Sequence, residues 1–345
     1  MQHTECIGAP PARQRAIFQA GPTRTNQPSE PKLAHFPVSF FSVVMGLAGL
    51  TLALHAAETA LGATHLASHS TYWITLAAFA AIAVVYAAKA IRVPNAVKAK
   101  WNHPIRLAFF PAISISLMLL GTASLAVAPS LAPVLWMLGA SLQFVLTLAV
   151  ISGWISSRAF QSGQLNPAWF IPAVGNVIAP IAGVQLGFLE VSWYFLAVGL
   201  IFWTVLLTLV MNRLIFHDLL PGKLQPTLVI LIAPPAVAFV AWVRMSGGEV
   251  DAFARILLNA AYFFTLLVAL QLPKILKLPF GLPFWSLSFP FAAVTIASFL
   301  FAKITGSAPH QLIGFVLLVV LLAIIAALVA RTIKAIARDE ICVPE

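Results

Sequence analysis

Four polar residues close together in the sequence have the types and the spacing of metal ligands. His65 and His69 are four residues apart, and His55 and Glu58 precede them. On a helix, this spacing could present two imidazoles to one metal ion. A short polar loop that carries incidental histidines explains the same residues more simply. We therefore expect no metal site and no cofactor.

Other reactive residue types show no pattern that is typical of an enzyme. The two cysteines, Cys6 and Cys342, stand in the two tails, and no CxxC spacing occurs. There is no GxxxxGK[ST] phosphate-binding loop, and the sequence alone does not assemble a Ser/His/Asp or Cys/His group. We expect a protein without enzyme activity.

The composition is that of an integral membrane protein. Of the 345 residues, 61% are hydrophobic and only 9% are charged, whereas soluble domains carry about 25% charged residues. Ten hydrophobic runs reach the roughly 20 residues that cross a bilayer as an α-helix. They lie near 35–57, 70–92, 104–127, 133–157, 167–188, 191–216, 226–246, 251–273, 280–303 and 309–335. The short connections between them predict antiparallel neighbours, and therefore five helical hairpins.

The basic residues predict the orientation in the membrane. Of the 20 Lys and Arg residues, only Arg244, Arg255 and Lys303 fall on one side, which leaves 17 for the other. An excess of Lys and Arg marks the cytoplasmic side. We therefore expect an inner (plasma) membrane protein with a disordered cytoplasmic tail over 1–34, a membrane domain over 35–336 and a cytoplasmic tail over 337–345. This distribution also explains the net charge of +10 without a nucleic-acid partner.

Prolines recur in alternate hydrophobic runs. Each odd-numbered run opens near one proline and carries a second one further in, whereas the even-numbered runs carry large aromatic residues. An internal proline removes a backbone donor and kinks a helix. These inner prolines are Pro37, Pro111, Pro172, Pro234 and Pro290. Together with the small residues of the same runs, they predict five kinked inner helices around a central pore, enclosed by five straighter outer helices.

A simpler explanation competes with the pore. Prolines and small residues in membrane helices often serve packing and hinges, and any single run favours that explanation. The alternation over all ten runs supports the pore. No Asp, Glu, Lys or Arg falls well inside a run, so the acidic relays of proton-coupled transporters are missing and passive movement is favoured.

The charges at the helix ends favour an anion. In this topology the inner helices begin at the cytoplasmic face, where the partial positive charge of their N-termini attracts anions. The basic residues near these starts are Lys32, Lys100, Arg106, Lys223 and Lys277. A role in setting the topology alone is an equal alternative for each of them.

Six segments of the chain carry a resemblance to a known family. They are FPVSFFSVVMGLAGLTLA at 36–53, HPIR at 103–106, NPAWFIPAVGN at 166–176, APP at 233–235, GEVDAFARIL at 248–257 and WSLSFP at 285–290. Each pattern is weak alone, but their order and spacing are specific. The chain resembles the tellurite-resistance/dicarboxylate transporter family over residues 35–335. That family includes TehA-type bacterial proteins and the plant slow-type guard-cell anion channels.

The resemblance implies five hairpins in a quasi-fivefold arrangement, assembled in the lipid bilayer as a homotrimer with one pore in each subunit. It also implies that the phenylalanine before the kink of the ninth run, here Phe289, occludes the pore and gates it. The residues at the matching position of the other inner runs are Phe36, Phe110, Ile171 and Ala233. Polar candidates for the pore lining are Ser39, Ser42, Ser114 and Asn176. Ser39 and Ser42 stand where family members often have glycine.

We expect passive conduction of small monovalent anions, such as chloride and nitrate, through this pore. The alternative is a carrier that uses the proton-motive force to export C4-dicarboxylates, sulfite or tellurite-related oxyanions. The family name supports the carrier, whereas the absence of acidic residues inside the runs supports the channel.

Overall fold

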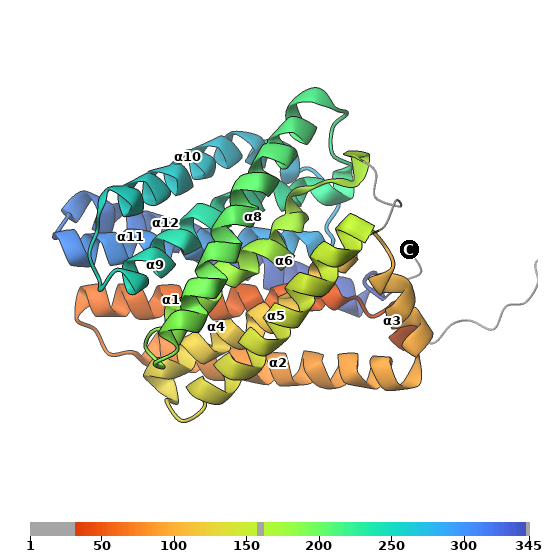
Figure 1. The fold of residues 1–345 in the computed structure, drawn as a ribbon. Coiled ribbons are helices and arrows are strands. Elements are labelled where there is room, and N and C mark those ends of the chain that lie inside the picture. Colours follow the sequence, from red (N-terminus) through yellow and green to blue (C-terminus); the bar gives the residue numbers. More distant parts are fainter. Residues whose placement is uncertain (1–31, 157–161, 343–345) are drawn as a thin grey trace, which may run out of the picture. The chain divides into compact units, whose positions relative to one another are not determined.

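Helices account for all regular secondary structure in residues 32–156 and 162–342, the part of the chain that the computed structural model describes (Figure 1). The prediction of an all-helical fold rich in apolar helices is therefore confirmed. In these residues, nine helices are long and apolar enough to cross a membrane. They are Val38–Leu61, Leu66–Arg92, Leu107–Val127, Ala132–Ser156, Leu189–Phe216, Gly222–Met245, Ala252–Ile275, Leu282–Thr305 and Ala308–Ala337.

The fifth predicted run, 167–188, differs from the other nine. Its apolar helical segment, Pro167–Gly183, is shorter and is divided into η6 (Pro167–Trp169), α6 (Phe170–Val174), η7 (Gly175–Ile178) and α7 (Ala179–Gly183). Pro172 and Pro180 each lack the amide N–H that a continuous α-helix requires. The sequence predicted one kink here, at Pro172, whereas the segment is divided further because Pro172 and Pro180 both interrupt the α-helical hydrogen bonds.

The other four odd-numbered runs begin as 3-10 helix and become α-helix near the inner proline. These pairs are η3 (Val38–Phe40) with α1 (Phe41–Leu61), η4 (Leu107–Phe109) with α4 (Ala112–Val127), η8 (Gly222–Ile232) with α9 (Ala233–Met245), and η9 (Leu282–Leu287) with α11 (Ser288–Thr305). Pro111, Pro234 and Pro290 thus stand at or within the first turn of an α-helix, where a missing N–H costs little. Pro37 precedes η3 in an extended conformation.

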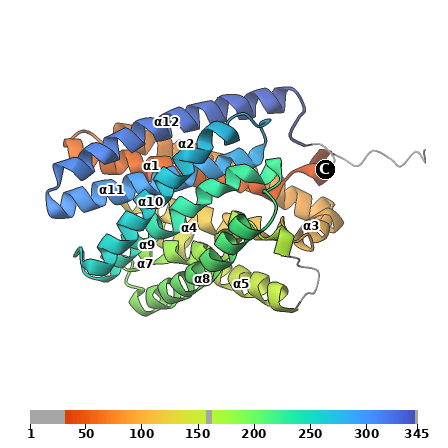
Figure 2. The ribbon, with the colours of Figure 1, turned by 90° about the horizontal axis from the view of Figure 1, so that it is seen from above.

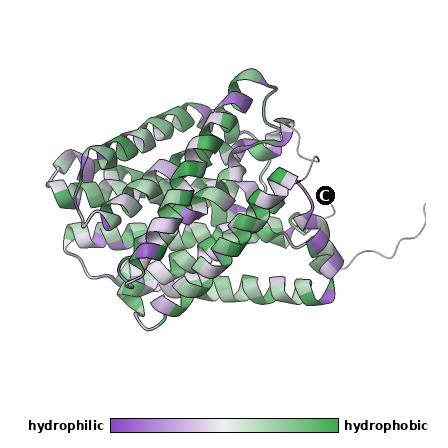
Figure 3. Ribbon diagram, viewed as in Figure 1, coloured by the Kyte–Doolittle hydropathy of each residue, from purple (hydrophilic) through white to green (hydrophobic). Residues whose placement is uncertain are grey.

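Burial separates two classes of helix. The even-numbered runs form α2 (Leu66–Arg92), α5 (Ala132–Ser156), α8 (Leu189–Phe216), α10 (Ala252–Ile275) and α12 (Ala308–Ala337). In their most apolar stretches only 17–39% of the residues are buried, against 61–89% in the four long odd-numbered helices. Apolar side chains exposed on the outer helices suit contact with lipid. Hydrophilic residues gather at the helix ends and in the short α3 (Pro94–Trp101), which the sequence analysis did not predict (Figure 3).

The odd-numbered elements contact one another in a closed circuit. We call α1, α4, α6–α7, α9 and α11 the inner segments, each with its 3-10 start. In that order each contacts the next, and α11 contacts α1 again. Each also contacts the outer helix that follows it in the chain, from α1 with α2 to α11 with α12. Figure 2 shows the outer helices α12 and α8 at opposite borders of this arrangement.

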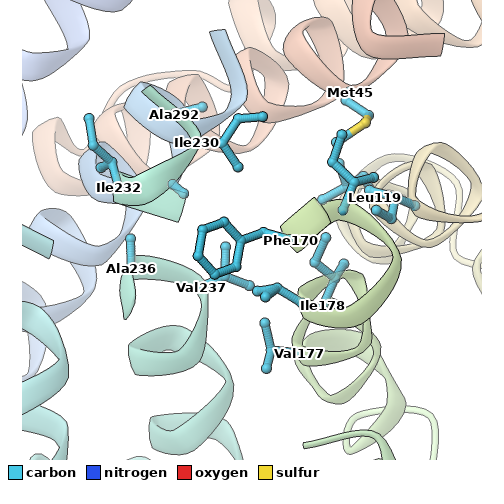
Figure 4. Packing of buried hydrophobic residues seen from close by; sticks show 14 of the residues in the cluster. Met45, Leu119, Phe170, Val177, Ile178, Ile230, Ile232, Ala236, Val237 and Ala292 are labelled. Atoms are coloured by element: carbon cyan, nitrogen blue, oxygen red, sulfur yellow. The ribbon is translucent and has the colours of Figure 1, made fainter. Parts of the chain in front are cut away.

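The inner segments share one apolar core. Figure 4 shows Met45 of α1, Leu119 of α4, Phe170 of α6, Ile230 of η8 and Ala292 of α11 directed toward the space among these elements. All five are at least nine-tenths buried. Because the buried residues come from every inner segment, the loss of any one segment would open the core.

Glycines permit the closest approaches between helices. Gly46 and Gly49 on α1 face Ser288 and Ala292 on α11, and a Cβ atom at Gly49 would lie 2.8 Å from the Cβ of Ala292. Gly139 on α5 likewise faces α4 so closely that an added Cβ atom would clash with it. The first and last inner segments therefore meet at a notch lined by the two glycines of α1.

A pair of glycine substitutions in α5 tests this packing. At Gly139, an added Cβ would lie 2.8 Å from the backbone nitrogen of Met118 and 2.9 Å from the carbonyl oxygen of Ser114. We expect Gly139→Ala to destabilise the protein by about 1–3 kcal/mol, because two backbones must separate. Gly153→Ala is the control in the same helix, since its nearest neighbour would be a side-chain methyl 3.9 Å away.

Thermal unfolding of the purified protein in detergent measures the difference. Gly153→Ala should leave the midpoint unchanged or raise it slightly, because alanine favours helix over glycine by about 1 kcal/mol. An equal midpoint for Gly139→Ala and wild type would show that α4 and α5 are not packed as described.

Candidate functional site

A cavity of about 540 Å³ lies among the inner segments. Most of its lining comes from the half of each segment that lies away from the 3-10 starts. Representative lining residues are Thr51 of α1, Thr122 of α4, Ile181 of α7, Val237 of α9 and Ala293 of α11. We call the end of the bundle where α1 finishes and α2 begins the distal end, and the end with the 3-10 starts the proline end. Ser68 and Gln311, from the first turns of α2 and α12, also line the cavity.

The cavity wall is mostly apolar, and its hydroxyl groups are bonded to their own helices. Thr51 Oγ1 donates to the carbonyl oxygen of Leu47 at 3.0 Å, and Thr122 Oγ1 donates to that of Met118 at 2.8 Å. Such a wall offers few strong partners to a passing solute, so it would hold an ion only weakly.

The charged residues that line the cavity are basic. Arg244, in the last turn of α9, and Lys303, in the last turn of α11, reach it near the distal end, and His55 of α1 lines it as well. Among the described residues that line it, none is Asp or Glu. Cations beside low-dielectric walls create a positive potential that concentrates anions.

The sequence did not indicate a role for these two cations at a cavity. Arg244 and Lys303 were used only to predict the orientation in the membrane, and the attraction of anions was expected at the other end, near Lys32 and the other basic residues at the helix starts. Lys32 forms an exposed ion pair with Asp339 at 2.7 Å, and the hydrogen bond to that carboxylate raises the pKa of Lys32. No local pattern shows that the ends of α9 and α11 meet the same cavity.

Phe289 lies where the cavity approaches the proline end. It is the second residue of α11 and is partly buried. Of the residues of α11 that line the cavity, it is the first in the sequence and therefore the nearest to the proline end. Its ring comes close to α1 at Gly49, where an added Cβ would lie 3.3 Å from Phe289 Cδ2. The position of Phe289 in this cavity is a finding, whereas its role as a gate stays a prediction.

The residues matched to Phe289 in the other inner runs occupy different surroundings. Phe36 stacks on Phe40 with ring centroids 4.6 Å apart, and Phe110 meets Trp101 edge to face at 4.9 Å. Ile171 and Ala233 are buried, and Ser39 and Ser42 are half-buried. None of these six predicted positions is among the residues that line the cavity: Phe36, Ser39, Ser42, Phe110, Ile171 and Ala233.

Ser114 and Asn176 belong to a buried hydrogen-bond network. Ser114 Oγ donates to Gln143 Oε1 of α5 at 2.6 Å, and Gln143 Nε2 donates to the carbonyl oxygen of Pro172 at 3.0 Å. Asn176 Nδ2 donates to Thr147 Oγ1, also on α5, at 3.1 Å. Neither Ser114 nor Asn176 lines the cavity, because their polar atoms bond to α5 and to the interrupted fifth run. The sequence alone did not show whether Ser114 and Asn176 line a pore or form hydrogen bonds to a neighbouring helix.

The histidines noted first do come together in space. The rings of His55 and His65 stack with centroids 4.4 Å apart, and those of His65 and His69 with centroids 6.2 Å apart. Glu58 accepts hydrogen bonds from the backbone nitrogens of Ala67 at 2.8 Å and Ser68 at 3.3 Å, so its charge stabilises the start of α2. In residues 32–156 and 162–342 no group of three or more His, Cys, Asp or Glu is arranged to hold a metal ion. Cys6 lies outside the described residues.

Helices that are long and apolar enough to span a membrane surround a cavity. In the described part of the chain, this cavity has basic but no acidic lining residues. These features define a multi-pass membrane protein of the channel or transporter class. The sequence profile of the SLAC1 family, described as voltage-dependent anion channel, matches residues 35–333. The chain therefore belongs to the SLAC1/TehA family, as the resemblance in its sequence predicted.

Two kinds of relative illustrate the family. The chain is 28% identical over 318 residues to the S-type anion channel SLAH3 of Arabidopsis thaliana, a match that covers 89% of this chain and 49% of the plant protein. It is 26% identical over 259 residues to the tellurite resistance protein TehA homolog of Haemophilus influenzae, which covers 75% and 79% of the two chains. For the S-type channel SLAH2 of Arabidopsis thaliana the identity is 29%, over 81% of this chain and 55% of the relative. The chain thus spans about half the length of these plant relatives.

Substitution of Gln143 tests the buried network. Gln143→Leu keeps a side chain of similar size but leaves Ser114 Oγ and the carbonyl oxygen of Pro172 with fewer partners. We expect a loss of about 1–3 kcal/mol, because two buried hydrogen bonds are lost. Thr204→Val on the exposed surface of α8 is the control and should change stability by about 0.5 kcal/mol or less. Chemical unfolding in detergent compares the two, and equal effects would contradict the role of Gln143.

Proposed function

We propose that this protein conducts small monovalent anions, such as chloride and nitrate, passively through a pore along the axis of its inner segments. The observation that carries this proposal is the cavity, which is lined by all five inner segments and has basic but no acidic lining residues in the described part of the chain. Membership of the SLAC1/TehA family supports the same substrate class. A weakly binding wall favours rapid release of the ion.

The proposed architecture has ten membrane crossings, arranged as five helical hairpins with quasi-fivefold symmetry. The contacts of each inner segment with its following outer helix support the hairpins, and the closed circuit of inner segments supports the ring. The interrupted segment Pro167–Gly183 supplies the fifth inner crossing. Irregular backbone at this depth is tolerated because protein surrounds it.

The orientation and the assembly follow from the charge bias and the family. We place both termini in the cytoplasm, so that the distal end with Arg244 and Lys303 faces the other side of the inner (plasma) membrane. Residues 1–34 and 337–345 are then cytoplasmic tails of a membrane domain over 35–336. The subunit assembles as a homotrimer in the bilayer, with a separate pore in each copy.

Phe289 is the proposed gate. Among the residues of α11 that line the cavity, Phe289 is the nearest to the 3-10 start, so its ring could block the path from the cavity toward the proline end. Gly49 leaves space beside the ring on α1. In this proposal, movement of this one side chain opens the cavity toward the proline end.

Truncation of the gate is the direct test. We expect Phe289→Ala to raise anion conductance in planar bilayers on the order of tenfold, which corresponds to a barrier lowered by about 1.4 kcal/mol. Phe263→Ala is the matched control, because it removes the same ring from an exposed position of the outer helix α10, where it is 60% exposed. Unchanged conductance for Phe289→Ala, with the protein present in the bilayer, would remove Phe289 as the gate.

The same preparation separates the channel from the proton-driven carrier. A channel passes current along the anion gradient alone, whereas the carrier requires a pH gradient and saturates with substrate. Flux of a C4-dicarboxylate or of sulfite that appears only with a pH gradient would overturn passive conduction. The absence of acidic residues from the described cavity lining favours the channel.

The distal cations should increase anion conductance. We expect Arg244→Gln combined with Lys303→Gln to lower anion conductance about threefold or more at low ionic strength, because two charges near the pore are lost. The effect should shrink at about 1 M salt, where charges are screened within about 3 Å. Arg331→Gln, on the exposed surface of α12, is the control. Equal conductance for the wild type, the double variant and Arg331→Gln would show that the cavity cations do not act on the ion.

A further inference from the structure

Two histidine rings stand at the distal mouth of the cavity. His55 lines the cavity from α1, and His65, in the turn between α1 and α2, stacks on it with ring centroids 4.4 Å apart. In the described part of the chain, the Nδ1 atoms of both residues are buried and lack a hydrogen-bond partner. Buried polar atoms usually have partners, so this pair is an exception that calls for an explanation.

Charged groups of both signs surround the pair. Glu58 of α1 brings its Oε2 to 3.6 Å from His65 Nδ1. The ring of His69 of α2 lies 6.2 Å from that of His65, and Lys303 of α11 and Arg244 of α9 line the same cavity as His55.

The remaining elements around the cavity add no titratable group near the pair. The lining residues of α4, of α7 with the turn after it, and of α12 include Thr122, Gln185 and Gln311 but, among the described residues, none that titrates. The carboxylate of Glu58 is itself bound to the backbone nitrogens at the start of α2. Glu58 therefore lies beside His65 without lining the cavity, where its charge would repel anions.

We propose that His55 and His65 form a proton-dependent binding site for small anions at the distal mouth, together with Lys303. The proposal rests on the anion conduction proposed above. When the distal solution is acidic, the pair gains a proton from the solution, and the added positive charge attracts an anion to the mouth. As the distal pH rises, the pair loses this proton, and the attraction of the anion is left to Arg244 and Lys303.

The direction of the effect follows from the chemistry of imidazole. Histidine is the side chain that changes its charge between about pH 5 and pH 8. Because protonation and anion binding favour each other, acid on the distal side increases anion occupancy and conductance, and a bound anion makes the pair harder to deprotonate. Acid on the opposite side has no access to the pair and should leave conductance unchanged.

A one-sided pH change in planar bilayers tests the site. We would use Phe289→Ala, so that the gate does not limit current, in about 10 mM chloride, where charges act over about 30 Å. Lowering the distal pH from about 7.5 to about 5.5 should raise conductance about twofold to threefold. Adding His55→Gln and His65→Gln should abolish this rise. His310→Gln is the control, because His310 packs on Phe301 and does not line the cavity, and it should keep the rise.

A second measurement does not depend on conduction. The histidine pair is titrated by NMR in the purified protein, once in sodium nitrate and once in sodium gluconate at equal ionic strength. We expect nitrate to move the titration midpoint of the pair to higher pH, and Lys303→Gln to reduce this difference.

The outcomes distinguish the two proposals. Current without a pH-dependent rise, or a rise that survives the double histidine substitution, would overturn the histidine site and leave anion conduction intact. Absence of current in every variant would overturn conduction, and the NMR midpoint then decides the site alone. Identical midpoints in nitrate and gluconate would overturn it.

Discussion

The fold depends on hydrogen bonds that side chains make to backbone carbonyl groups at the proline end. A carbonyl group without a partner in the bilayer interior costs on the order of several kcal/mol, and each inner segment starts with irregular or 3-10 backbone. A side-chain donor bonds to a backbone carbonyl group at or near each of the five starts, and the carbonyl groups of Pro111 and Trp285 also accept a backbone N–H. The pairs are Lys89 with Phe36, Ser114 with Pro111, Gln143 with Pro172, Ser286 with Pro226, and Ser288 with Trp285.

These bonds stabilise inner segments whose two halves have different roles. The starts pack into the apolar core, whereas the regular distal halves enclose the cavity. The outer helices contribute donors such as Lys89 and Gln143, and they approach closely at glycines such as Gly199, where an added Cβ would lie 3.0 Å from the backbone nitrogen of Val177. Lipid-facing helices therefore stabilise the lining of the cavity from outside.

The sequence was sufficient for the helical class, the alternation of buried and exposed helices and the family, because hydropathy and the repeated prolines extend over many residues. It was insufficient for contacts that depend on tertiary structure. Ser114 and Asn176 resemble pore-lining residues in an apolar run, yet both bond to α5. Arg244 and Lys303 resemble topology signals, yet both line the cavity. A kink of the fifth run at Pro172 was predicted, but its hydropathy did not show that the run divides into four short helical pieces.

The notch on α1 has a consequence for biosynthesis. Gly46 and Gly49 face Ser288 and Ala292, so the first inner segment is completed by residues that the ribosome adds about 240 positions later. Until α11 emerges, α1 exposes a groove that offers lipid a poor fit and another helix a good one. Closure of the circuit is therefore a late event of synthesis, and a chain truncated before α11 would present this groove to quality-control proteases or to neighbouring membrane proteins.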